Sequence, residues 1–161
     1  VRSQHHRHRT WSYNEISRRY TSKDIQFYEP NVFRVQHKTN RQASTDEKIN
    51  PVVYPDWDNT EEGFRANHII QNHHKSSLTL YQRLIASGVC REQARGILPQ
   101  NMYTEYYGTC NLNNLLKFID LRTHKGAQWE IQRVAEACLE IATDLWPYTV
   151  TAYRKLRGGT T

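Results

Sequence analysis

Apolar side chains recur with a helical period most clearly between residues 127 and 146. They are spaced three or four residues apart, so they share one stripe along a helix. A proline follows directly at position 147, and proline ends helices because it lacks a backbone N–H. The pattern predicts an amphipathic helix over 127–146. Its apolar stripe comprises Ile131, Val134, Cys138, Ile141 and Leu145.

The rest of the chain predicts further helices and little strand. Glycine is favoured just past a helix end, and Gly88 stands at such a place. Asn111 occupies the position of an N-cap residue. Residues 10–20 could open either a helix or a loop. The remaining predicted helices cover 61–87, 91–98, 112–121 and 148–156, and one predicted strand covers the Tyr- and Thr-rich residues 102–110.

Residues 21–60 predict an irregular surface excursion. Pro30, Pro51 and Pro55 would interrupt a long helix, and the residues between them are mostly polar and typical of turns. With this excursion set aside, the 161 residues predict a single domain over 1–161. Its expected fold class is mixed α/β, of the α+β kind, mostly helical with a short strand.

Charge points to an anionic partner, and several classes of site are disfavoured. The net charge of +6 suits a nucleotide, a nucleic acid or an acidic surface. No apolar run approaches the roughly 18 residues of a membrane span, and no secretory leader is present, so we expect a cytoplasmic protein. The cysteines show no CxxC spacing, the histidines no HExxH, and no glycine-rich phosphate loop occurs. We therefore predict no metal site.

The densest candidate chemistry lies in residues 7–20, RHRTWSYNEISRRY, which we call the arginine-rich segment. Arginine presents a planar fork of donors that matches phosphate and carboxylate groups. The interspersed hydroxyl, amide and carboxylate side chains could bind a sugar or the edge of a base. A basic surface that binds nucleic acid remains an alternative interpretation.

Three other arginines add to this inventory. Arg91 and Arg95 are four residues apart on the predicted short helix, so they face the same way. Arg122 stands at the end of the helix over 112–121, where the helix dipole alone would favour a cation. These residues by themselves leave a structural role and a ligand-binding role equally open for Arg122.

Four ordered blocks of the chain resemble the flavin-dependent thymidylate synthases. The arginine-rich segment is similar to the RHR signature of that family. REQARGILP, YTEYYGTCNLNNLLKFIDLR and AQWEIQRVA resemble its later blocks. The resemblance covers residues 1–20 and about 77–153. It implies a mixed α/β thymidylate synthase-complementing fold and a homotetramer whose subunits share active sites. It also implies a strand-rich region preceding the signature, so we expect the sequence to be an N-terminally truncated part of a longer chain.

The activity that the resemblance implies is the reductive methylation of dUMP to dTMP. Methylenetetrahydrofolate supplies the carbon, and NADPH supplies the hydride through FAD, with neither a membrane nor a nucleic acid as partner. The resemblance assigns the stabilisation of an anionic uracil ring to Arg122, as the catalytic residue. The FAD contacts that it implies are Arg7, His8, Arg9, Glu15, Asn111, Asn113 and Lys117. The implied dUMP contacts are Gln4, His5, His6, Arg7, Glu15, Ile16, Ser17, Arg18, Arg19, Arg95 and Arg122.

Three positions depart from the family pattern. Many members have arginine where Asn113 stands, and histidine or asparagine where Lys117 stands. The family often has histidine directly before the AQ of AQWEIQRVA, whereas this chain has Gly126 there and His124 two positions earlier. A homologue that keeps the scaffold without turnover is therefore a further hypothesis, beside the nucleic-acid-binding module.

Overall fold

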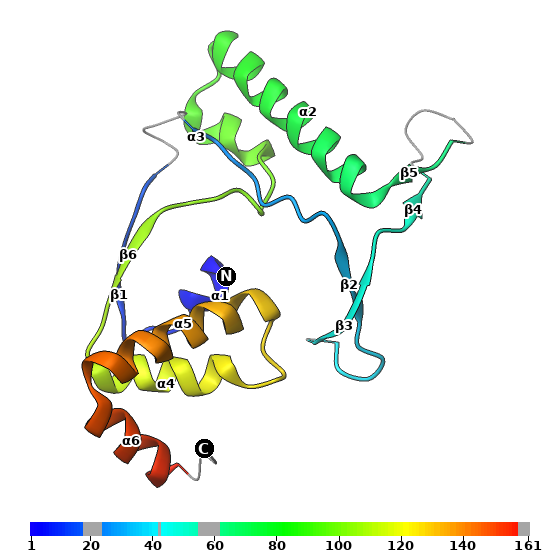
Figure 1. Ribbon diagram of the computed structural model, residues 1–161. Coiled ribbons are helices and arrows are strands. Elements are labelled where there is room, and N and C mark those ends of the chain that lie inside the picture. Colours follow the sequence, from blue (N-terminus) through cyan, green and yellow to red (C-terminus); the bar gives the residue numbers. More distant parts are fainter. Residues whose placement is uncertain (18–23, 42, 55–61, 158–161) are drawn as a thin grey trace. The chain divides into compact units, whose positions relative to one another are not determined.

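The computed structural model describes residues 1–17, 24–41, 43–54 and 62–157. Its backbone contacts divide the chain into two compact units, which are described one at a time. The first unit comprises 1–14, 36–45 and 107–161, and the second comprises 15–35 and 46–106. Helices and short strands occur together, which confirms the mixed α+β class (Figure 1). The prediction of one domain over 1–161 stays a prediction.

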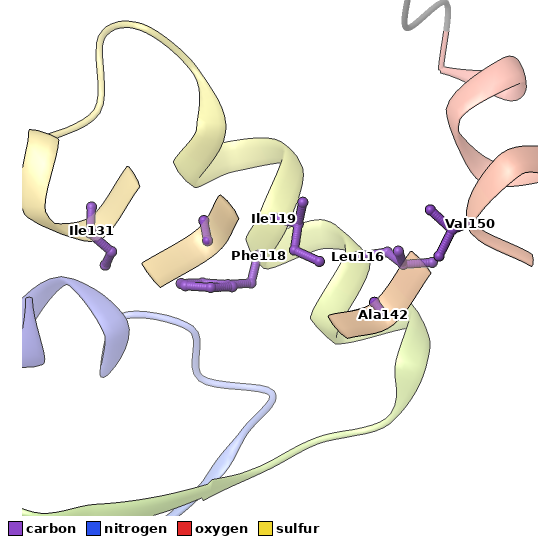
Figure 2. Packing of buried hydrophobic residues seen from close by; sticks show 7 residues of the cluster. Leu116, Phe118, Ile119, Ile131, Ala142 and Val150 are labelled. Atoms are coloured by element: carbon purple, nitrogen blue, oxygen red, sulfur yellow. The ribbon is translucent and has the colours of Figure 1, made fainter. Parts of the chain in front are cut away.

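The first unit is built on helices that pack around one apolar cluster. Its helices are α1 (Arg2–His5), α4 (Leu112–Thr123), α5 (Trp129–Leu145) and α6 (Pro147–Leu156). Figure 2 shows Phe118 and Ile119 of α4 packed with Ile131 of α5, and Val150 of α6 near Leu116. Phe118 and Ile131 are completely buried, and full burial of such a side chain is worth roughly 1.5–3 kcal/mol.

Local sequence signals explain where these helices begin. The side chain of Asn111 accepts a hydrogen bond from the backbone N–H of Asn114 at 2.9 Å, so it caps α4 as predicted. Pro147 is the first residue of α6, where its missing N–H costs nothing. The predicted helices over 112–121, 127–146 and 148–156 are thus confirmed, with ends shifted by one or two residues.

The buried face of α5 is rotated away from the predicted stripe. Ile131 is buried, but the core side of the helix continues through Ala135 and Ala142, which lie close to α4. Ile141 and Leu145 are about 60% exposed. The small Ala135 and Ala142 let α5 pack closely on α4 beside Ile131, and Cys138 of the predicted stripe is partly buried against the same cluster.

The second unit is organised by the long helix α2 (Ala66–Ala86). It is followed by α3 (Arg91–Ala94) and the 3₁₀ turn η1 (Arg95–Ile97). The predicted helix over 61–87 begins late because β5 (Phe64–Arg65) pairs antiparallel with β4 (Val52–Val53). His74 of α2 is buried, stacks on Phe27, and is hydrogen-bonded to Glu29 and Asn101, which ties residues 27–29 to this helix.

Two strand pairs correct the sequence-based expectations. The strand β1 (Ser12–Glu15) pairs with β6 (Tyr106–Thr109), so residues 12–15 are neither helix nor loop. The strands β2 (Phe33–Gln36) and β3 (Ser44–Ile49) pair inside the supposed irregular excursion. The prediction of irregular structure was wrong there because the prolines lie outside the paired residues. The predicted strand over 102–110 is shorter, with Met102 in an isolated bridge to Phe27.

Among the described residues, no helix is both long and apolar enough to cross a membrane.

The end of α2 provides a test of local backbone strain. Gly88 has a φ of +90°, and the amides of Gly88 and Val89 donate to the carbonyls of Ile85 and Leu84, as in a Schellman motif. Gly88→Ala should lower the free energy of unfolding by about 1–2 kcal/mol, because a β-carbon disfavours positive φ. Chemical denaturation measures the change. Gly96→Ala is the control, since its β-carbon would meet no atom within 4 Å and no positive φ is involved.

Candidate functional site

A pocket of about 420 Å³ lies in the first unit, where residues 1–9, which we call the N-terminal segment, meet the end of α4 and the start of α5. This volume falls in the range of about 300–1,000 Å³ that is typical of small-molecule sites. Folding brings three predicted site residues, Gln4, Arg7 and Arg122, to the same pocket. The complete lining is Ser3, Gln4, Arg7, Arg122, Gly126, Ala127 and Gln128.

The pocket is positively charged. Its lining contains two guanidinium groups, three neutral polar side chains and two small residues, and none of these residues is acidic. Burial, and then the charge of the neighbouring Arg7, lower the pKa of Arg122 from its ordinary value. Two uncompensated cations next to each other favour an anionic or electron-rich ligand.

Two hydrogen bonds fix the guanidinium of Arg122. Its Nε donates to His8 Nε2 at 3.1 Å, and its Nη2 donates to the backbone carbonyl of Gln4 at 3.1 Å. Because His8 Nε2 accepts, the proton of the neutral ring must be on Nδ1. Burial, and then the charge of Arg122, lower the pKa of His8, so both effects favour this neutral form.

An aromatic cluster packs against the N-terminal segment. Tyr13 donates its hydroxyl to the carbonyls of His5 (2.6 Å) and His8 (3.1 Å). The rings of His5, His8 and Trp11 all lie within 5.5 Å of the Phe118 ring, centroid to centroid. His5 is therefore buried, and desolvation followed by the charges around it lowers its pKa to about 4.

The residues predicted to contact flavin from α4 lie at its first turns. Asn111 is the N-cap, while Asn113 and Lys117 are exposed and, being four residues apart, share one side of the helix. Asn114 of α4 donates to the carbonyl of Thr10 and so holds Thr10 against the helix. The preceding residue, Arg9, is exposed. The structural role of Asn111 is observed directly, and its flavin contact stays a prediction.

Other predicted residues belong to the second unit. Glu15 accepts a hydrogen bond from the Thr104 hydroxyl at 2.8 Å. Arg95 is exposed, and its Nε donates to the carbonyl of Glu92 at 3.4 Å. Ile16 is exposed and Ser17 is half-buried, whereas Arg18 and Arg19 lie outside the described residues. His6, in the first unit, packs on the Tyr13 ring. Their contacts with dUMP stay predictions.

Sequence reasoning missed the wall of the pocket formed by residues 126–128, and also Ser3. The signal was present for Gln128, because it stands in the AQWEIQRVA block, but no role was assigned to it. In this wall the amide of Gly126 donates to His124 Nδ1 at 3.0 Å. A β-carbon at position 126 would lie 3.2 Å from the same nitrogen, so the His124 ring fills the space beside the glycine.

No group of three or more His, Cys, Asp or Glu side chains suited to a metal ion occurs in 1–17, 24–41, 43–54 and 62–157.

Comparison with known proteins identifies the family. The family described as thymidylate synthase complementing protein matches residues 1–148, so the chain belongs to this family. A flavin-dependent thymidylate synthase of Thermus thermophilus is 39% identical over 155 residues, covering 96% of this chain and 53% of the relative. One from Aquifex aeolicus is 43% identical over 136 residues, covering 84% and 39%. The chain spans about half the length of the curated relatives it matches.

A solved structure agrees with this assignment. The chain is similar to the UMP/dUMP methylase PolB of Streptomyces cacaoi bound with 5-Br UMP, with a TM-score of 0.75 and 31% sequence identity. The similarity covers 95% of this chain and 67% of that one. The thymidylate synthase-complementing fold expected from the sequence is therefore confirmed.

The buried histidine predicts how stability depends on pH. His5 titrates near 6.5 in an unfolded chain and near 4 in the folded one, so between these values the unfolded chain binds a proton that the folded chain excludes. The free energy of unfolding should fall as pH drops from 6.5 to 4, by about 3 kcal/mol from His5. Urea denaturation at a series of pH values measures this loss.

A matched pair of variants isolates the histidine. His5→Phe should flatten most of the pH dependence and leave a smaller slope from His8, whereas His73→Phe, at an exposed position of α2, should leave it unchanged. An undiminished slope in His5→Phe would contradict the assignment.

Proposed function

We propose that the protein acts as a flavin-dependent thymidylate synthase, which converts dUMP to dTMP with methylenetetrahydrofolate as carbon donor and NADPH as reductant. The observation that carries the proposal is the pocket in which Gln4, Arg7 and a doubly fixed Arg122 converge. Membership of the family and the names of the relatives support it. A cytoplasmic location remains part of the expectation.

Arg122 is proposed to be the catalytic residue. Bond formation at a uracil carbon builds negative charge on the ring, and a positive group already aimed at that charge lowers the barrier without having to reorganise. The contacts to His8 and the Gln4 carbonyl hold the guanidinium in one place before the substrate binds. Such a preorganised donor is typically worth about 3–4 kcal/mol.

The proposed flavin contacts fit a large anionic cofactor. Arg7 and Arg9 are exposed guanidinium groups, and Asn113 and Lys117 add an amide and an ammonium on one side of α4. When bound, FAD would supply the hydride, taken from NADPH, that reduces the transferred one-carbon unit to a methyl group. His8 would contribute as a neutral ring, because Arg122 occupies its Nε2. Glu15 and Asn111 complete the proposed set.

The remaining proposed dUMP contacts extend the site beyond this pocket. His5 and His6 belong to the segment around Gln4, and Glu15, Ile16 and Ser17 follow the arginine-rich signature. We propose that these later residues, with Arg18 and Arg19, serve dUMP bound mainly by a neighbouring subunit. Arg95 is proposed to contact dUMP as well.

Exposed apolar side chains on α5 and α6 support the proposed homotetramer. Ile141 and Leu145 are adjacent on one side of α5, and Tyr148 and Leu156 of α6 are almost fully exposed. Large apolar side chains gathered on neighbouring helices are typical of surfaces that a partner covers. A second copy of the chain is the occupant that the family resemblance implies.

Turnover by the full-length protein tests the function and the role of Arg122 together. The protein expressed from its complete reading frame should be yellow with a flavin spectrum and should form dTMP. Arg122→Ala should lower kcat for dTMP formation by at least about 100-fold, because the positive group facing the ring is lost. Chromatographic detection of dTMP measures the rate, and absorbance measures the flavin content.

Arg133→Ala is the matched control, since this exposed arginine pairs with Glu136 on the surface of α5 and does not line the pocket. It should keep both flavin and turnover. Full turnover in Arg122→Ala would refute the catalytic role. A folded wild-type protein that carries flavin but forms no dTMP would favour a homologue without turnover. A colourless one that binds DNA with a steep salt dependence would favour the nucleic-acid-binding module.

Charge placed on the exposed side of α5 should weaken self-association. Leu145→Glu is expected to shift the protein to smaller oligomers in light scattering, since a carboxylate would have to be buried at the interface. Circular dichroism should show unchanged helix content, because Leu145 is 61% exposed in the subunit. Asp144→Leu, at an exposed neighbouring position, is the control and should keep the oligomer. An unaltered mass for Leu145→Glu would exclude this surface as the interface.

A further inference from the structure

A buried histidine joins three parts of the second unit. His74 of α2 is only 3% exposed, and its ring stacks on the Phe27 ring with the centroids 4.6 Å apart. Its Nδ1 lies 2.7 Å from Glu29 Oε1, and its Nε2 lies 2.8 Å from Asn101 Nδ2. We call His74 and its two hydrogen-bond partners, Glu29 and Asn101, the histidine anchor.

The partners of His74 determine which atoms of the anchor donate. An ionised carboxylate only accepts hydrogen bonds, so His74 Nδ1 carries the ring proton and Nε2 accepts from Asn101. Asn101 Nδ2 also donates to the backbone carbonyl of Tyr28 at 2.9 Å. Turning the amide of Asn101 would place its oxygen against this carbonyl and against an acceptor nitrogen. The anchor therefore has one arrangement that pairs both sides of the His74 ring.

Residues 101–105 lie beside residues 26–28, next to the anchor. The amide of Tyr28 donates to the carbonyl of Asn101 at 2.9 Å, and the amide of Tyr103 donates to the carbonyl of Gln26 at 2.8 Å. Such short two-stranded pairings are only marginally stable by themselves. The buried contact with His74 of α2 favours one position for the whole stretch 101–105.

The same stretch also holds two of the proposed dUMP contacts. The amide of Ile16 donates to the carbonyl of Glu105 at 3.0 Å, and Glu15 accepts from the Thr104 hydroxyl at 2.8 Å. Arg95, a further proposed contact, belongs to η1, which leads into this stretch. All these residues belong to the second unit, so the anchor and the proposed contacts share one frame.

We propose that His74 is a positioning residue for dUMP binding. Through Asn101 it holds residues 101–105, and these residues hold Glu15 and Ile16 where the nucleotide binds. This rests on the proposed function, because it takes Glu15 and Ile16 as contacts of dUMP. Since His74 is buried, its effect reaches the nucleotide only through the residues that it holds.

Steady-state kinetics of the flavin-loaded protein from its complete reading frame tests the anchor. His74→Phe keeps an aromatic ring against Phe27 and removes both hydrogen bonds. It should raise KM for dUMP by about tenfold, because only about one molecule in ten then has the arrangement that binds. The value of kcat should stay within about twofold, since saturating dUMP selects that arrangement. His74→Gln, whose amide oxygen can replace Nε2 as acceptor, should return KM most of the way to the wild-type value.

Two further variants separate positioning from a general loss of stability. His73→Phe makes the same change at the exposed neighbouring position of α2 and should leave KM unchanged. Asn101→Leu should raise KM about as much as His74→Phe does. The double variant should be no worse than either single one, because both substitutions remove the same contact.

An unchanged KM in His74→Phe would overturn the proposal. Effects of His74→Phe and Asn101→Leu that multiply in the double variant would also overturn it, because the two residues would then act separately. A loss of kcat and of flavin content without a change in KM would reduce His74 to a structural role. A folded wild-type protein that forms no dTMP would instead overturn the proposed function, and this proposal with it.

Discussion

The pocket depends on the bond between Arg122 and the N-terminal segment. Arg122 lies in the last turn of α4, a helix capped by Asn111 and packed through Phe118, so its backbone is well fixed. The N-terminal segment has only the four-residue helix α1 of its own. It is held instead by side chains, with Arg122 on His8 and the Gln4 carbonyl and Tyr13 on two further carbonyls. The rigid helix therefore gives the irregular segment its shape.

This arrangement changes how the RHR signature is understood. From the sequence alone, Arg7, His8 and Arg9 could be taken for three consecutive positive charges. In the structure the central His8 is a neutral acceptor for Arg122, while Arg7 lines the pocket and Arg9 is exposed. The neutral ring lets two arginines approach one pocket, because a protonated His8 would add a third positive charge between them. His8 therefore holds the guanidinium of Arg122 in place without adding a charge of its own.

The sequence predicted several helix ends well because their signals are local. Asn111, Pro147 and Gly88 act within one helical turn, and the structure has each of them in the expected role. Strands β2 and β3 were missed because their pairing uses backbone groups, which the mostly exposed polar side chains of β3 do not reveal. In β1 the half-buried Tyr13 and Glu15 alternate with the exposed Ser12 and Asn14. Most of these residues are polar, so the sequence did not show the alternation.

The sequence also predicted only part of the candidate site. The resemblance named Gln4, Arg7 and Arg122, and the fold brings them together. The hydrogen bond between the Gln4 and Gln128 side chains could not be read from the sequence, because it depends on which side chains meet. Glu15 and Arg95, which the resemblance also named, belong to the other unit, and their contacts with dUMP stay predictions.

The close contact between His124 and position 126 also constrains how this loop can evolve. The imidazole of His124 fills the space beside Gly126, and the glycine amide is bonded to it. Restoring the histidine that the family often has at 126 would push a side chain into that ring. The two positions are therefore coupled, because a larger side chain at 126 would require the His124 ring to move.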